Sequence, residues 1–352
     1  MKGSLRAKIV RQRTWAAAWH NIPVTISKQS PFSLATWGEL IDTAYRRIQS
    51  LITKTPLEDV SATFPGAQAR VFFKMENLQQ TGSFKFRGAT NKIKSLTQAA
   101  AQRGVIAASN GNHGMAVAEA ARIAGIQAEV YVSEHVAEAK ALRIQELGAT
   151  IRRHGTDPLH AELAARSAAE SSGKIFISPY NDAEVIAGQG TVAFECVRQA
   201  GQIDAIFVTV GGGGLISGIG AYMKYASPMT EVVGCWPANS PVLYESMKAG
   251  QILAVPEQPT VSESTAGGLE AKSITLDICR NVIDRSVLVT EDEIMSAMRR
   301  VRDVNGWLIE GAAGVAIAAF EKEMQRYAGR NVVIVICGGN ISSKVKSALD
   351  AA

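Results

Sequence analysis

The sequence predicts an α/β protein built from two open parallel sheets, each covered by helices on both faces. From about residue 70 onward, short runs rich in β-branched residues alternate with longer alanine-rich stretches, which is the pattern of repeated strand–helix units. This alternation is unusually regular from residue 104 to about 178, and 352 residues are too many for one such sheet. We therefore expect two sheet domains with a ligand-binding cleft between them.

The expected elements follow one another in chain order. Strands are expected at 70–75, 104–109, 128–133, 149–155, 174–178, 205–211, 231–236 and 331–339. Helices between them include 115–125, 136–149 and 161–173, and the last two carry a glycine close to or just past their ends, a common stop signal. We assign 101–180 to a small inserted α/β domain, 39–100 together with 181–352 to a large domain, and 1–38 to an N-terminal extension.

Composition narrows the classes of function. The hydrophobic fraction of 47% and the charged fraction of 20% are ordinary for a globular protein, and no apolar run approaches the ~18 residues that a membrane span needs. The net charge is +5, but aromatic residues do not alternate with basic ones as they do in a nucleic-acid-binding groove. Four widely spaced cysteines give neither a zinc site nor a disulfide framework. We expect a cytoplasmic protein with a small-molecule ligand, and neither nucleic acid nor membrane as a partner.

One lysine stands in an unusual setting. Lys85 lies between Phe84 and Phe86, just where a helix is about to begin. Burial among aromatic rings disfavours the ammonium form and lowers the pKa of a lysine, which makes its amine a nucleophile at neutral pH. Lys85 is therefore the leading candidate for a catalytic residue.

Three polar turns follow expected strands. The glycines 211–214 stand between a strand and a helix, and without Cβ atoms they can present several N–H groups to one phosphate. The next strand does not end in the acidic residue of a dinucleotide-binding unit, and no G-K-[ST] follows the glycines, so the phosphate belongs to a smaller molecule. The turn 109–113 is either a helix cap or an anion site, and Cys337 ends a strand where a buried cysteine is usually only a small apolar residue.

A phosphorylated aldehyde held between strand ends, with a nucleophilic lysine beside it, describes pyridoxal 5'-phosphate. Six motifs then suggest a family: TGSFKFRGA, SNGNHG, VIAGQGTVAFE, GGGGLISGI, EGAAGVAIAAF and CGGNIS, in this order. Together they resemble the serine/threonine dehydratase family of fold-type II pyridoxal-phosphate enzymes, which includes serine racemases. The resemblance covers roughly residues 40–350 and implies a tryptophan-synthase-β-like fold with the cofactor in the cleft.

The resemblance also implies roles for individual residues. Lys85 would bind the cofactor covalently and Phe84 would pack beside its ring, while Asn112 would bond its 3-hydroxyl and Cys337 would face its pyridine nitrogen. The remaining cofactor-binding residues would be Gly211, Gly212, Gly213, Gly214, Leu215 and Glu310. The substrate-binding residues would be Ser83, Ser109, Asn110, Gly111, His113 and Gly267.

The implied reaction is loss of water from a β-hydroxy amino acid, giving a 2-oxo acid and ammonia. A neutral thiol cannot keep a pyridine nitrogen protonated, and this favours elimination over a long-lived carbanion. Lys85 would take the α-proton. L-Threonine or L-serine is the default substrate, but the segment 264–280 departs from the expected D-G-I-A-like pattern. Alternatives are therefore 3-hydroxyaspartate, phenylserine or a hydroxyectoine-derived compound.

Other departures from the family limit the reaction. Racemases carry a serine where this chain has Asn110, and an amide cannot act as the second base. Metal-activated relatives carry a carboxylate where this chain has Trp236, so we expect no metal site of that kind. Racemisation, β-replacement and a non-enzymatic binding role are the competing hypotheses, and family analogy suggests a homodimer or homotetramer.

Overall fold

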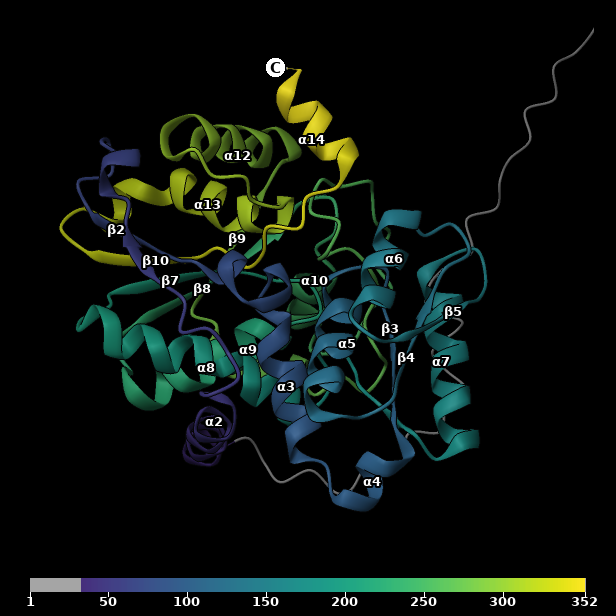
Figure 1. The fold of residues 1–352 in the computed structure, drawn as a ribbon. Coiled ribbons are helices and arrows are strands. Elements are labelled where there is room, and N and C mark those ends of the chain that lie inside the picture. The colour runs from purple at the N-terminus through teal and green to yellow at the C-terminus, as the bar shows by residue number, and fades with distance from the viewer. Residues whose placement is uncertain (1–32, 352) are drawn as a thin grey trace, which may run out of the picture.

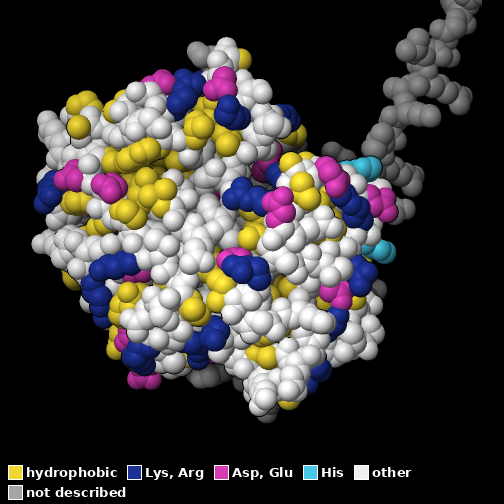
Figure 2. Space-filling model, in the orientation of Figure 1, with side chains coloured by type: hydrophobic (Ala, Val, Ile, Leu, Met, Phe, Trp, Pro, Cys, Tyr) yellow, Lys and Arg dark blue, Asp and Glu magenta, His cyan; other side chains and the backbone are white. Residues whose placement is uncertain are grey.

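The computed structural model describes residues 33–351, so most of the predicted extension, residues 1–32, lies outside the described part of the chain. The described part contains two separate sheets with helices around them (Figure 1). No described helix is long and apolar enough to cross a membrane. On the face shown in Figure 2, basic and acidic side chains are interspersed rather than gathered into one field.

The larger sheet has six strands in the order β1-β2-β10-β7-β8-β9. All neighbouring strands run parallel except β1, which pairs antiparallel with β2 at the edge. The strand bounds are β1 Leu57–Asp59, β2 Arg70–Lys74, β7 Ala205–Thr209, β8 Glu231–Pro237, β9 Arg285–Val289 and β10 Asn331–Val335. β7 is buried along its whole length, as expected for a central strand covered on both faces.

Helices cover both faces of this sheet. On one side lie α2 (Leu34–Ile48), α8 (Ala183–Ala200) and α9 (Gly214–Ala226), which contact one another, and on the other lie α12 (Glu291–Asn305) and α13 (Gly311–Glu323) (Figure 1). α13 is buried on nearly all sides because it is composed mostly of alanine, glycine and other apolar residues. The remaining helices of this part are α10 (Val242–Ala249), α11 (Thr275–Val282) and α14 (Ser343–Asp350).

The smaller sheet has four parallel strands in the order β5-β4-β3-β6. Its strands are β3 Val105–Ala108, β4 Ala128–Val132, β5 Thr150–Arg153 and β6 Ile175–Phe176. α5 (Asn112–Ala124) and α6 (Glu138–Glu146) pack on one face, and α7 (Pro158–Ser172) packs on the other. α3 (Lys85–Ser95) and α4 (Gln98–Arg103) precede β3, the first strand of this sheet, in the chain.

The two sheets have separate hydrophobic cores, with α3 between them. One core surrounds the larger sheet. The other surrounds the smaller sheet and includes Phe86, Ala89 and Ile93 from α3. The fold is therefore of the expected α/β class with two mainly parallel sheets, while domain boundaries at 38, 100 and 180 stay a prediction. The carboxyl ends of β3, β6, β7 and β10 lead into the residues of the site described below.

Candidate active site

A cavity of about 640 Å³ lies where the loops of the two sheets meet, a size typical of ligand pockets. Residues from loops and helices around both sheets contribute to its wall. They are Phe84, Lys85, Asn112, Pro158, Leu159, Glu162, Pro179, Tyr180, Thr209, Gly211, Gly212, Gly213, Gly214, Leu215, Glu257, Pro259, Glu263, Ser264, Thr265, Ala266, Gly267, Gly268, Ala312 and Cys337.

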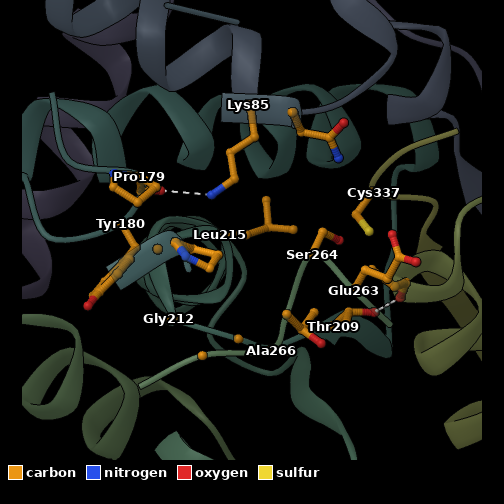
Figure 3. A pocket seen from close by; sticks show the side chains of 18 of the residues that line it. Lys85, Pro179, Tyr180, Thr209, Gly212, Leu215, Glu263, Ser264, Ala266 and Cys337 are labelled. Atoms are coloured by element: carbon orange, nitrogen blue, oxygen red, sulfur yellow. Dashed lines mark hydrogen bonds between the residues drawn. The ribbon is translucent and has the colours of Figure 1, made fainter. Parts of the chain in front are cut away.

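Lys85 is the first residue of α3 and points into this cavity (Figure 3). Its Nζ donates a hydrogen bond to the carbonyl oxygen of Pro179 at 2.8 Å and lies 5.1 Å from the centre of the Phe84 ring. Burial lowers the pKa of Lys85 to about 8, although Cys337 and Glu310 oppose the shift. A substantial share of this amine is therefore neutral near pH 7 to 8.

The backbone before Lys85 is tied to the end of β10. Phe84 donates its N–H to the carbonyl of Cys337 at 3.1 Å, and Ser83 forms an isolated antiparallel bridge with Gly338. Thr81 and Gly82 adopt positive φ angles of 63° and 75°, so the chain turns sharply at the point where α3 starts. These bonds place Lys85 next to the turn that carries Cys337.

The four glycines occupy the gap between β7 and α9. Added Cβ atoms would lie 2.7 Å from the Thr265 carbonyl oxygen at Gly211 and 2.5 Å from the Tyr180 ring at Gly212, so neither position has room for a side chain. The N–H groups of residues 211–213 donate no hydrogen bond to any residue that the structure describes. Free N–H groups beside the N-terminus of a 13-residue helix form a site for an anion.

The turn after β3 places only one of its side chains in the cavity wall. Asn112 lies in the wall, donates from Nδ2 to the Glu310 carboxylate at 2.9 and 3.2 Å, and accepts from Asn340 at 2.7 Å. Asn110 instead bonds the backbone and hydroxyl of Ser133 through its amide.

His113, the second residue of α5, is buried, and its Nε2 lies 2.8 Å from the Ile177 carbonyl oxygen. Burial and the nearby Lys85 lower the pKa of His113 to about 3, so the imidazole is neutral and Nε2 carries the proton that it donates to that carbonyl. Its Nδ1, like the Ser83 hydroxyl, is buried and has no hydrogen-bond partner in the described part of the chain.

Glu310 contacts Cys337 of the cavity wall from a position outside the lining. The Cys337 sulfur is 3.9 Å from Glu310 Oε1, and Ser264 donates to the same oxygen at 3.0 Å. Burial raises the pKa of both groups, that of Cys337 well above its ordinary value. Cys337 is therefore a neutral thiol near pH 7.

Of the residues expected from the sequence, the cavity wall brings together Phe84, Lys85, Asn112, Gly211, Gly212, Gly213, Gly214, Leu215, Gly267 and Cys337. It does not include Ser83, Ser109, Asn110, Gly111, His113 or Glu310, whose expected contacts with cofactor or substrate stay predictions. Sequence reasoning missed Tyr180, Glu162 and Glu257. Tyr180 follows a strand end and could have been found by that signal, whereas the two glutamates stand in no motif.

A family model described as pyridoxal-phosphate dependent enzyme matches residues 48–338. The chain belongs to this family. It is 36% identical over 303 residues to an L-threonine ammonia-lyase of Thermotoga maritima, covering 86% of this chain and 75% of that one. It is 37% identical over 310 residues to a serine racemase of Bos taurus, covering 86% of this chain and 92% of that one.

A solved structure of the processed form of threonine deaminase isoform 2 from Solanum lycopersicum matches with a TM-score of 0.86 at 27% identity, over 94% of this chain and 96% of that one. This confirms the fold-type II class expected from the sequence. The residues present fit the cofactor of the family, because a cavity-facing lysine with a lowered pKa and a loop with free N–H groups and no side chains meet in one cavity.

The residues that the structure describes contain no group of three or more His, Cys, Asp or Glu side chains arranged to hold a metal ion. Trp236, which stands where metal-activated relatives were expected to carry a carboxylate, is fully buried in the core of the larger sheet. Independence from divalent metals stays a prediction.

Proposed function

We propose that this pyridoxal-phosphate-dependent enzyme removes water from a β-hydroxy amino acid and releases a 2-oxo acid and ammonia. The observation that carries this proposal is the Lys85 amine, which has a pKa of about 8 and shares a cavity with the glycine loop 211–214. Similarity to enzymes named threonine ammonia-lyase and threonine deaminase supports the same reaction class. L-Threonine and L-serine are the default substrates.

Each group of the cavity has a task in this reaction. The N–H groups of residues 211–213 would hold the cofactor phosphate, and Asn112, fixed by Glu310 and Asn340, would orient the ring. Bound pyridoxal phosphate supplies the electron-withdrawing group that weakens the bond between the α-carbon and its proton. Lys85, as a neutral amine, takes that proton.

Cys337 favours elimination over reactions that need a long-lived negative charge. Its thiol is neutral because burial raises its pKa well above the ordinary value. A neutral thiol gives no charge that would hold a proton on a ring nitrogen. The site is therefore suited to a reaction in which the hydroxyl group leaves as Lys85 takes the α-proton.

Racemisation is the second candidate, because a serine racemase is among the relatives. Its second base would have to stand at position 110, where this chain carries an amide that is already bonded to Ser133 through both its oxygen and its nitrogen. An amide has no group that ionises near neutral pH, so Asn110 cannot act as that base. The proposal therefore favours the dehydratase. By analogy with related enzymes, we further propose that the protein is a homo-oligomer, that it lies in the cytoplasm and that it acts in amino-acid catabolism.

The test is ammonia and 2-oxobutyrate release from L-threonine by purified holoenzyme without added metal. Wild-type protein should release both in equal amounts, and Lys85→Ala should lose the activity. Lys94→Ala is the matched control, because Lys94 lies on the same helix with its side chain exposed. The proposal would be contradicted if neither ammonia nor the corresponding 2-oxo acid were released from threonine, serine or a larger β-hydroxy amino acid.

A further inference from the structure

Carboxylates outnumber cations in the cavity wall. Glu162, Glu257 and Glu263 line it, and Lys85 is the one lysine or arginine among the lining residues. Because the pKa of Lys85 is lowered to about 8, its charge compensates the carboxylates only in part, and it has none as a neutral amine. Such a wall favours a positively charged group in the ligand and disfavours an additional negative one.

Two of these carboxylates already have cationic partners. Glu162 on α7 pairs with Arg166 at 2.8 Å. Glu263 stands on the rim and pairs with Lys140 of α6 at 3.6 Å. The first pair lies within α7, and the second joins α6 to the loop that carries Glu263. Neither glutamate therefore needs a charge from a ligand.

Glu257 differs from the other two. Its Oε2 accepts hydrogen bonds from the Gly267 N–H, at 2.9 Å, and from the Ser240 hydroxyl, and both donors are neutral. In the described part of the chain no lysine, arginine or histidine forms an ion pair with it, and its Oε1 accepts no hydrogen bond there. One oxygen thus fixes the side chain, and the other is available to a ligand.

Space for a longer ligand lies next to this carboxylate. Gly267 lines the cavity, and a Cβ at this position would meet no atom within 4 Å. The φ angle of Gly267 is +128°, a backbone conformation that residues other than glycine rarely adopt. The glycine therefore keeps the wall open beside Glu257.

We propose that Glu257 is a specificity-determining residue that binds an ammonium group in the side chain of the substrate. This inference rests on the proposed dehydratase function. The substrate class is a β-hydroxy α-amino acid that carries an amine on its γ-carbon or beyond. A second side-chain carboxylate, as in 3-hydroxyaspartate, would meet the same negative wall and bind less well.

Binding of unreactive ligands tests the charge preference directly. 2,4-Diaminobutanoate and 2-aminopentanoate differ by an ammonium in place of a methyl group, and neither carries a hydroxyl that could leave. Calorimetric titration of the wild-type holoenzyme should show about tenfold tighter binding of the ammonium ligand, as for a partly exposed charge pair. Equal affinity of the two ligands would overturn the inference.

Glu257→Gln separates a charge role from a structural one. Glutamine can still accept from Ser240 and Gly267 through its oxygen, so the loop keeps its anchor while the charge is lost. The preference for the ammonium ligand should shrink about tenfold in this variant. An equal loss of affinity for both ligands would mean that Glu257 only supports the loop. Glu245→Gln, which removes an α10 carboxylate outside the cavity wall, should keep the wild-type preference.

Turnover separates this inference from the proposed function. Ammonia release is compared for threonine, 4-aminothreonine and 3-hydroxyaspartate, and kcat/KM should be highest for 4-aminothreonine and lowest for 3-hydroxyaspartate. If threonine is the best of the three, the dehydratase stands and the role of Glu257 is wrong. If none releases ammonia while the ammonium ligand still binds more tightly, the dehydratase is wrong and the Glu257 contact stands.

Discussion

Arg87 donates from Nε to Glu76 at 2.7 Å in the interior of the protein, two residues after Lys85 on α3. Arg87 also pairs with Glu195 on α8 at 2.9 Å, and Glu195 pairs with Lys74 of β2 at 2.6 Å. All four side chains are fully or almost fully buried. Two cations and two carboxylates thus join β2, α3 and α8, and they hold the helix on which Lys85 lies.

Arg87→Met should destabilise the protein strongly. The substitution leaves Glu76 and Glu195 buried with Lys74 as their one remaining cation in the network. Removing one partner of a buried ion pair typically lowers the free energy of unfolding by about 3–5 kcal/mol. Urea unfolding of the wild type and variant measures the loss. Lys94→Met, an exposed change on the same helix, should shift the free energy of unfolding by no more than about 0.5 kcal/mol. If Arg87→Met lowered the free energy of unfolding by no more than Lys94→Met does, the network would have no stabilising role.

His113 should make the fold sensitive to acid. Its pKa is lowered to about 3 in the folded protein by burial, from 6.5 in the unfolded chain. The unfolded chain therefore binds the extra proton first, and stability falls as the pH drops below about 6.5, by up to about 1.4 kcal/mol per pH unit from this group.

Urea midpoints between about pH 7 and about pH 5 test this dependence. His113→Gln, which can still donate to the Ile177 carbonyl, should have a shallower decrease in the free energy of unfolding than the wild type. His154→Gln replaces an exposed histidine of the same part of the chain and should behave as the wild type does. Parallel pH profiles for wild type and His113→Gln would rule out this assignment.

Gly212→Ala should weaken cofactor binding. The added Cβ would lie 2.5 Å from the Tyr180 ring, so the loop must shift and its N–H groups lose their arrangement. We expect about a tenfold higher dissociation constant for pyridoxal phosphate, measured from absorption during titration of the cofactor-free protein. Gly66→Ala is the matched control, because its Cβ would meet only the end of the Met324 side chain at 3.4 Å. Unchanged cofactor affinity in Gly212→Ala would show that the phosphate binds elsewhere.

Little D-serine should form from L-serine during turnover. Asn110 holds Ser133 through two hydrogen bonds and offers no group that could add a proton from the second face. Chiral chromatography of the remaining serine, sampled alongside pyruvate release, measures the ratio of the two reactions. D-Serine accumulating as fast as pyruvate would mean that a base other than residue 110 acts on that face.

The fold class was predictable because the strand runs in the chain are strongly apolar. β7 and β10 are buried along most of their length, and such runs can be recognised without a structure. β1 and β9 were not expected: β1 has only three residues at a sheet edge, and β9 is half-exposed at three of its five positions. Short and exposed strands carry too little of the apolar pattern to be recognised.

The glycine loop and Cys337 were predictable because each follows a strand end, and Lys85 was predictable because it stands between Phe84 and Phe86 at the start of a helix. Contacts between distant motifs were not predictable. Asn340 bonds Asn112 across 228 positions, and this contact exists only because β3 and β10 direct their carboxyl ends to the same cleft. Glu257 stands outside any motif. It could not be predicted from the sequence, because its chemistry depends on the loops that surround it in the fold rather than on its neighbours in the chain.

The most direct test of the account is to locate the cofactor on the chain. Holoenzyme is reduced with borohydride to fix the covalent bond between lysine and pyridoxal phosphate, digested, and mapped by mass spectrometry. The cofactor should be found on the peptide that contains Lys85, and Lys85→Ala should leave no labelled peptide. Label on another lysine, such as the buried Lys74, or a wild-type protein that takes no label, would contradict the assignment of this cavity as the active site.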